Sequence, residues 1–440
     1  MTVTIECEFY IQQFYQKKSM SDKKYSPESL MMSYGYNPEL SEGAIKCPIF
    51  QTSTFVFRNA QEGKAFFEIA YGKRAIRASE EMGLIYSRIN NPNLEIVEKR
   101  LTLWDGAADA AVFESGMSAV STVLMEFLKP GDIVLYSTPL YGGSHHFLNH
   151  VLSKFGIRAI GFDASDADKN IEDLLRDEDV RRKVALIYLE TPANPTNTLV
   201  DIKYCADVAE TLSTAEKKII VAVDNTYLGP IWQHPLQLGA DLVIYSATKY
   251  LGGHSDLTAG AVLGNSDHIQ RLKVMRTFLG NMCSPNTAWL LLRSLETLKV
   301  RMDQQQANAV QVAEFLDRHE RVEKVHYLGL IDRSESSKQY QIYKDQCLGS
   351  GAMVSFHIKG GEQEAFAFLN GLRLIKLAVS LGGTESLAEH PATMTHTDIP
   401  DEEKLRIGIT EQLIRISIGI ENAKDIIADL DRALWMINGD

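Results

Sequence analysis

Lys249 stands in the segment SATKY at residues 246–250, directly after an apolar run typical of a buried strand. A lysine at the end of such a strand is unusual, because these positions favour apolar or small side chains. A desolvated amine has a lowered pKa and becomes a usable nucleophile, and the hydroxyls of Ser246 and Thr248 can donate to an anion. On position alone, a solvated lysine on a turn fits equally well.

Asp224 and Gly116 also follow apolar runs, at residues 219–223 and 110–113. A carboxylate such as Asp224 is often only a helix cap or turn former. Beside a nucleophilic lysine it gains a further task, which is to hold a proton on the ring nitrogen of a cofactor. Gly116 precedes a helical pattern, whose first backbone N–H groups favour a phosphate, although glycine is common at such turns for structural reasons.

The elements that must position these residues form an α/β pattern. From about residue 105, short apolar runs alternate with helical ones, which predicts a mainly parallel sheet with crossover helices on both faces. Ligands bind beyond the carboxyl ends of such strands, so the polar residues there should converge on one crevice. The predicted strands are residues 110–113, 133–136, 185–189, 219–223, 242–245 and 260–263.

Three regions are expected along the chain. Residues 1–90 contain few periodic segments and predict an extended arm, residues 91–298 the sheet domain, and residues 299–440 a smaller α+β domain. In the last of these regions we predict strands at 352–358 and 414–418 and a closing helix at 425–436, preceded by one long helix from Asn286 to about His319.

The composition excludes several classes of function. The formal net charge of −12 over 440 residues argues against a nucleic-acid or anionic-membrane partner. The five cysteines are dispersed, which fits neither a disulfide framework nor a metal site. Met1–Met20 does not resemble a signal peptide, and no apolar run is long enough for a membrane helix, so we expect a cytoplasmic protein.

Six segments, taken in order, resemble the Cys/Met-metabolism enzymes of pyridoxal-phosphate fold type I. Each segment alone is a weak signal, whereas the ordered set is highly specific. The segments are YSRINNP at 86–92, SGM at 115–117, LYG at 140–142, ETPANP at 190–195, DNT at 224–226 and SATKY at 246–250.

The resemblance implies an aspartate-aminotransferase-like fold that uses pyridoxal 5′-phosphate. Lys249 would form the Schiff base and carry protons, Asp224 would pair with the pyridinium nitrogen, and Tyr141 would stack on the ring and act as acid or base. Tyr86 and Arg88 would reach the phosphate in the neighbouring subunit, which implies a homo-oligomer, a tetramer built from dimers. The implied cofactor contacts are Tyr86, Arg88, Gly116, Met117, Tyr141, Glu190, Asn194, Asp224, Thr226, Ser246, Thr248 and Lys249.

The C-terminal region supplies the expected substrate contacts. An arginine between apolar strand neighbours is costly unless a carboxylate meets it, so Arg415, aided by Ser380, would bind the substrate α-carboxylate. An internal salt bridge with a glutamate is the alternative. Val379 would form an apolar wall where cystathionine-handling relatives often have glutamate.

Residues 378–396 resemble the branch of the family that acts on methionine. This predicts γ-elimination on methionine or homocysteine, and leaves γ-replacement on an activated homoserine or cystathionine γ-lyase activity as alternatives. Three features depart from that branch: Gly143 replaces a cysteine, Arg276 and Thr277 replace a Lys-Asp pair, and residues 71–82 are additional.

Two other classes of protein remain to be weighed. Ser246 and Lys249 fit the SxxK pattern of penicillin-recognising serine enzymes, but the companion SDN and KTG motifs are absent from the sequence. A non-enzymatic binding module is a further alternative. His145, His146 and His254 lack a carboxylate or cysteine at ligand spacing, so we predict no metal site.

Overall fold

A computed structural model describes residues 25–77, 80, 83–334, 337–397 and 399–437. The prediction for Met1–Met20, and part of that for residues 71–82, therefore fall outside the described residues. Within the described ranges, no helix combines the length and the apolar character needed to span a membrane.

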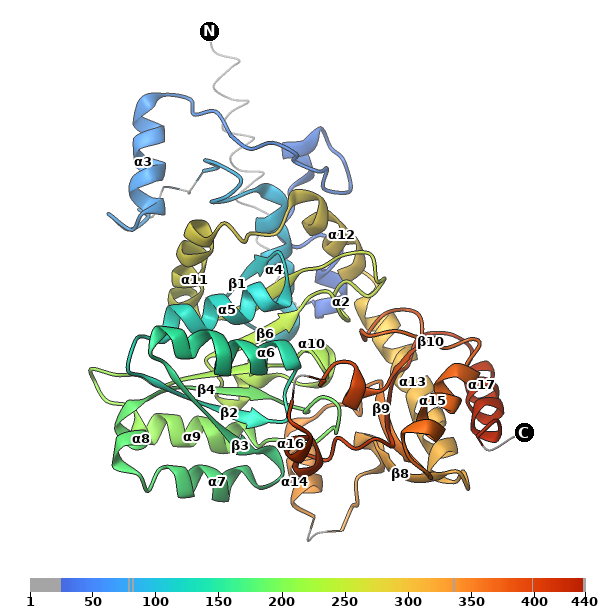
Figure 1. The fold of residues 1–440 in the computed structure, drawn as a ribbon. Coiled ribbons are helices and arrows are strands. Elements are labelled where there is room, and N and C mark those ends of the chain that lie inside the picture. Colours follow the sequence, from blue (N-terminus) through green and yellow to red (C-terminus); the bar gives the residue numbers. More distant parts are fainter. Residues whose placement is uncertain (1–24, 78–79, 81–82, 335–336, 398, 438–440) are drawn as a thin grey trace.

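A seven-stranded sheet forms the centre of the larger part of the molecule (Figure 1). All six predicted strands are present, and the parallel strands β3, β2, β4, β5 and β6 lie side by side. β7 runs antiparallel to both β6 and β1, so the sheet is mixed at that edge. In sheet order the strands are β1 (Asp109–Phe113), β7 (Gly260–Gly264), β6 (Leu242–Ser246), β5 (Ile220–Asp224), β4 (Val184–Glu190), β2 (Ile133–Thr138) and β3 (Arg158–Asp163).

Strand β3 was not predicted. It lies at the edge of the sheet, begins at the exposed Arg158 and ends at Asp163, and only Phe162 is fully buried. Edge strands of this kind lack the continuous apolar run by which buried parallel strands are found.

Helices cover both faces of the sheet, and each face has its own apolar core. On one face α5 and α11 pack against β1, β6 and β7, and on the other α7 and α9 pack against β3, β4 and β5. The helices of the N-terminal and sheet regions are α2 (Pro27–Leu30), α3 (Ala60–Ala70), α4 (Pro92–Asp105), α5 (Gly116–Phe127), α6 (Gly142–His146), α7 (Ala167–Leu174), α8 (Glu178–Lys183), α9 (Ile202–Leu212), α10 (Gly229–Trp232), α11 (Ser266–Leu279) and α12 (Pro285–Leu295).

The C-terminal part contains a second sheet of five strands, packed against helices α13, α15 and α17. The predicted strands at 352–358 and 414–418 and the closing helix are present. In sheet order the strands are β10 (Lys376–Leu377), β11 (Leu387–Glu389), β12 (Leu413–Ser417), β9 (Met353–Ile358) and β8 (Val322–His326). The helices are α13 (Leu298–Asp317), α14 (Lys338–Gln346), α15 (Glu362–Gly371), α16 (Asp401–Arg406) and α17 (Ala423–Trp435). Short 3₁₀ or π turns are η1 (Pro38–Ser41), η2 (Phe147–Val151), η3 (Leu152–Phe155), η4 (Ala164–Asp166), η5 (Pro235–Leu238), η6 (Leu328–Leu330) and η7 (Pro391–Thr393).

The prediction of one long helix from Asn286 to His319 was wrong, because a turn interrupts the helix between α12 and α13. The carbonyl of Ser294 accepts hydrogen bonds from the backbone N–H and hydroxyl of Thr297, at 3.2 Å each, and from the Arg301 guanidinium at 3.0 Å. These donors occupy a carbonyl that a continuous helix would pair with the amide four residues later.

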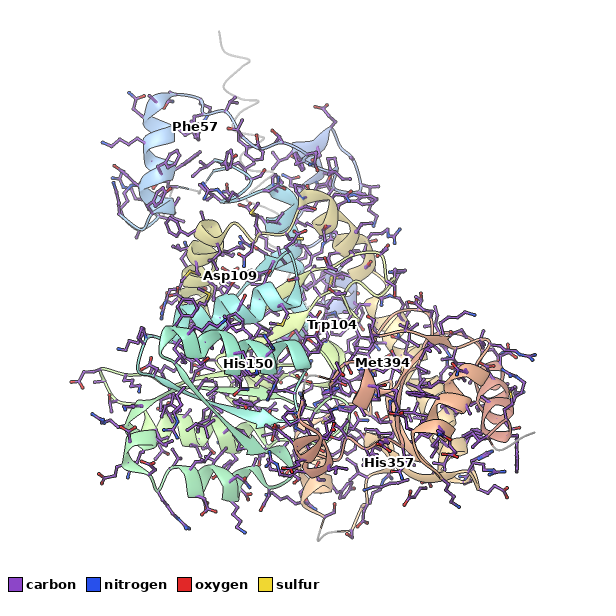
Figure 2. The ribbon with its side chains drawn as sticks, viewed as in Figure 1. Phe57, Trp104, Asp109, His150, His357 and Met394 are labelled. Atoms are coloured by element: carbon purple, nitrogen blue, oxygen red, sulfur yellow. The ribbon has the colours of Figure 1, made fainter. Side chains whose placement is uncertain are left out.

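The N-terminal segment rises away from the sheet and carries the unpredicted helix α3 (Figure 1). Asn59 caps this helix by accepting from the Glu62 amide at 2.8 Å. Phe57, labelled beside α3 in Figure 2, packs edge-on against Phe66 with ring centres 6.0 Å apart. A local aromatic cluster therefore stabilises the helix.

Candidate active site

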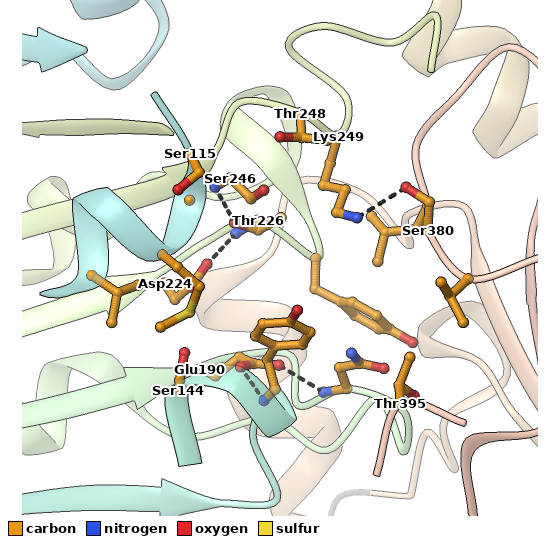
Figure 3. A pocket seen from close by; sticks show the side chains of 18 of the residues that line it. Ser115, Ser144, Glu190, Asp224, Thr226, Ser246, Thr248, Lys249, Ser380 and Thr395 are labelled. Atoms are coloured by element: carbon orange, nitrogen blue, oxygen red, sulfur yellow. Dashed lines mark hydrogen bonds between the residues drawn. The ribbon is translucent and has the colours of Figure 1, made fainter. Parts of the chain in front are cut away.

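A cavity of about 320 Å³ lies at the carboxyl ends of the parallel strands and is closed on its far side by the C-terminal part. Figure 3 shows that its side chains converge from both parts of the chain. The following predicted site residues line this cavity: Gly116, Met117, Tyr141, Glu190, Asn194, Asp224, Thr226, Ser246, Thr248, Lys249, Val379, Ser380 and Arg415.

Lys249 follows β6, and its side chain crosses the cavity toward the C-terminal part (Figure 3). Its Nζ donates to the Ser380 hydroxyl at 2.9 Å. Burial lowers the pKa of Lys249 to about 8; the charge of Arg415 lowers it further, and Glu389 opposes the shift. A larger fraction of this amine than of an ordinary lysine is therefore neutral, and nucleophilic, near neutral pH.

Asp224 ends β5 on the opposite side of the cavity floor and is only 8% exposed. Its carboxylate accepts from the Tyr188 hydroxyl at 3.2 Å and from the Thr226 amide at 3.0 Å. Burial raises the pKa of Asp224, and among the described residues no cation forms an ion pair with it. A protonated ring nitrogen would supply that missing positive charge, so this end of the cavity fits a pyridine ring.

Glu190 lies directly opposite Asp224 in the β4–β5 register. Burial and the charge of Asp224 raise the pKa of Glu190 to about 8. Its two oxygens accept from the backbone amides of Tyr141, at 2.8 Å, and Asn194, at 3.2 Å. Glu190 thus links the segment after β2 to the segment after β4.

A phosphate-sized anion fits at the N-terminus of α5. Ser115 caps the helix through the Ser118 amide, and the remaining N–H groups of the first turn have no partner inside the helix. A side chain at Gly116 would place its Cβ 2.8 Å from the Ser246 side chain, so the close approach of β6 requires glycine. Ser246 and Thr248 face this point from the other side (Figure 3).

Gly143, one of the three sequence departures, lies beneath Tyr141. A Cβ at this position would come within 2.6 Å of Tyr141 Cε1 and 3.1 Å of the Met117 sulfur. Glycine therefore allows the Tyr141 ring, which is 44% exposed, to lie against the backbone.

Arg415 forms the internal salt bridge considered from the sequence and also lies at the cavity wall. Glu389 Oε1 is 2.7 Å from its Nη1. The guanidinium donates further to Asn194 Oδ1 at 3.0 Å and to the Ser380 carbonyl at 2.8 Å.

Tyr86 and Arg88 do not line the cavity of their own chain. Arg88 donates to the Thr277 carbonyl at 2.7 Å and lies 5.9 Å from the centre of the Tyr86 ring. Arg276, beside Thr277, is 2% exposed and forms a salt bridge with Glu98 at 2.6 Å, so Glu98 balances its charge inside the protein.

Several cavity residues were not predicted as site residues. Ser115, Tyr227 and Leu381 adjoin predicted positions and Thr395 lies in the segment 378–396, so their neighbours could have indicated them, whereas no sequence pattern marked the others. They are Ser115, Val120, Ser144, Tyr227, Thr258, Leu381 and Thr395. In the part of the chain that the structure describes, no cluster of three or more His, Cys, Asp or Glu side chains could hold a metal ion.

The geometry agrees with the comparisons with known proteins. The cystathionine γ-lyase of Lactobacillus plantarum, solved with L-serine, superimposes with a TM-score of 0.82 at 31% identity, covering 94% of this chain and 100% of that one. Residues 28–435 match the Cys/Met metabolism PLP-dependent enzyme family. The chain belongs to this family.

Members of this family with known activity resemble the chain over most of its length. The L-methionine γ-lyase of Pseudomonas putida is 40% identical over 403 residues, covering 91% of this chain and 95% of that protein. The cystathionine γ-lyase of Rattus norvegicus is 41% identical over 356 residues, covering 81% and 86%. Family membership makes the chain a pyridoxal-phosphate-dependent enzyme and rules out both the SxxK hydrolase and the simple binding module.

Proposed function

We propose that this enzyme catalyses γ-elimination on methionine or homocysteine and releases 2-oxobutyrate, ammonia and a thiol. Pyridoxal phosphate supplies the electron sink for the reaction. Lys249 would hold the cofactor and then move protons at the substrate α- and β-carbons, while Tyr141 would donate a proton to the leaving sulfur. Arg415 and Ser380 would bind the α-carboxylate.

Val379 carries the proposed choice of substrate. It lies in the cavity wall next to Ser380 and is 56% exposed, so it presents an apolar surface to the substrate side chain. The carboxylates that line the cavity in the described chain are Glu190 and Asp224, both at the cofactor end. The distal amino group of cystathionine would meet no carboxylate near Val379, whereas a methylthio group would be buried there without cost.

The assay that tests this proposal measures 2-oxobutyrate released from methionine, homocysteine, cystathionine and O-acetylhomoserine, together with the leaving group, which is a thiol or hydrogen sulfide from the sulfur substrates and acetate from O-acetylhomoserine. We expect the highest kcat/KM with methionine or homocysteine. Val379→Glu should lower kcat/KM for methionine by roughly 10- to 100-fold, since it places a charge beside an apolar group. Val379→Leu, the matched control, should keep the preference, and release from cystathionine alone by the wild-type enzyme would refute the proposal.

Cystathionine γ-lyase activity is the second candidate, favoured by the similarity to the rat enzyme. The same assay separates the two. A kcat/KM for cystathionine above that for methionine, increased further in Val379→Glu, would establish the second candidate in place of the first.

We further propose a cytoplasmic homotetramer in which Tyr86 and Arg88, on the arm of residues 1–90, complete the site of a neighbouring subunit. Neither residue reaches the cavity of its own chain. The same segment exposes Leu40 at 81% and Val56 at 96%, and such apolar surface is typical of an interface.

Complementation tests this arrangement. Arg88→Ala removes the residue proposed to act in trans, and Lys249→Ala removes the one acting in cis. Each variant should be nearly inactive, but subunits mixed by reversible dissociation should regain part of the activity, because some mixed sites contain both residues. Two Lys249→Ala preparations mixed in the same way are the control, and no recovery in the Arg88/Lys249 mixture would contradict a shared site.

A further inference from the structure

Glu389 is a completely buried carboxylate placed directly against Arg415. The two residues are partners in the β11–β12 register, so their side chains lie on the same face of the second sheet. Glu389 Oε1 lies 2.7 Å from Arg415 Nη1 and accepts from the Thr395 hydroxyl at 2.9 Å. Its other oxygen, Oε2, has no hydrogen-bond partner among the described residues.

The remaining donors of Arg415 define how a second carboxylate could bind. Nη1 is occupied by Glu389 and Asn194, and Nη2 donates once, to the Ser380 carbonyl. Nε has no partner among the described residues. A guanidinium has five N–H donors, so one Nη2–H remains for a carboxylate in the cavity, whereas Nε–H is buried inside the protein.

We propose that Glu389 is a resident carboxylate that weakens the hold of Arg415 on the carboxylates of substrate and product. This proposal rests on the role of Arg415 in the proposed function. A ligand carboxylate would bind to a guanidinium whose charge Glu389 already balances, and the two carboxylates would repel each other across it.

This arrangement suits a reaction whose product keeps the carboxylate. 2-Oxobutyrate carries the same α-carboxylate as the amino acid, so a tighter hold on one would also slow the release of the other. Interactions equally strong with substrate and transition state lower KM without raising kcat. Glu389 thus acts through Arg415 as a positioning residue that keeps carboxylate binding moderate.

The test measures binding of a matched ligand pair to the holoenzyme through the change in visible absorbance of bound pyridoxal phosphate. L-norleucine has a methionine-like chain without a leaving group, and pentylamine is the same chain without the carboxylate. Glu389→Gln should bind norleucine about tenfold more tightly, with pentylamine unchanged. With reacting substrate, KM and the inhibition constant of 2-oxobutyrate should fall together without a gain in kcat.

Two further variants make the outcome decisive. Thr395→Val removes the hydroxyl that stabilises Glu389 but leaves both charges, so norleucine should bind more weakly, opposite in sign to Glu389→Gln. This variant also keeps the inference testable if Glu389→Gln fails to fold. Glu411→Gln removes an exposed carboxylate just before β12 and should bind both ligands like the wild type, which controls for net charge.

Equal or weaker norleucine binding in a folded Glu389→Gln enzyme would overturn the inference and leave Glu389 a purely structural partner. Loss of norleucine binding relative to pentylamine in Arg415→Leu separately tests the carboxylate role of Arg415. Because norleucine undergoes no elimination, these results stand even if the substrate assay refutes methionine as substrate.

Discussion

Lys249→Ala is expected to lower turnover by about 10³-fold or more, because one residue would no longer hold the cofactor and carry the substrate protons. The visible absorbance of covalently attached pyridoxal phosphate should disappear as well. The free energy of unfolding should be unchanged or slightly higher, since the variant removes an amine that burial already destabilises as a cation.

Steady-state kinetics, absorbance spectra and thermal unfolding check these three expectations. Lys203→Ala is the matched control, because Lys203 is an exposed lysine paired with Asp207 on the surface of α9. It should behave like the wild type in all three measurements. Near wild-type turnover in Lys249→Ala would remove the basis of the proposed mechanism.

Asp224→Asn is expected to lower kcat on the order of 10²- to 10⁴-fold with the fold preserved. The amide keeps the size of the carboxylate and can still bond to the Tyr188 hydroxyl and Thr226 amide, but it cannot stabilise a protonated ring nitrogen. The affinity for pyridoxal phosphate should also fall. Kinetics at saturating cofactor separates the loss of kcat from the loss of affinity.

Glu190→Gln provides the comparison for Asp224→Asn. The two carboxylates face each other in the β4–β5 register, and the charge of Asp224 raises the pKa of Glu190. If relief of this repulsion were the main effect, both variants would change kcat alike. We expect the smaller loss in Glu190→Gln, and equal losses would contradict the specific role of Asp224.

The sequence predicts the sheet well because its central strands are buried on both faces and appear as continuous apolar runs. The edge strand β3 lacks such a run, and the break between α12 and α13 depends on side-chain bonds to the Ser294 carbonyl that hydrophobic periodicity does not encode. Helix α3 begins with polar residues and packs against its own neighbours, so its pattern is equally weak.

The cavity was predictable where its residues belong to ordered motifs, and thirteen of the fifteen predicted site residues line it. Tyr86 and Arg88 do not line it, and their place in the site of a neighbouring subunit stays a prediction. The sequence did not identify Glu389 as the partner of Arg415. The cross-strand register that pairs them is a property of the fold and joins residues that lie far apart in the sequence.

The division of the cavity between two sheets affects how this enzyme can diversify. Asp224 and Glu190 end strands of the seven-stranded sheet and Lys249 follows one, whereas Val379, Ser380 and Arg415 belong to the C-terminal part. Under the proposed function, a substitution at Val379 would alter which amino acid is accepted while the residues around the cofactor stay the same. New substrate preferences would then arise, by drift or directed evolution, through the C-terminal wall of the cavity without rebuilding the chemistry.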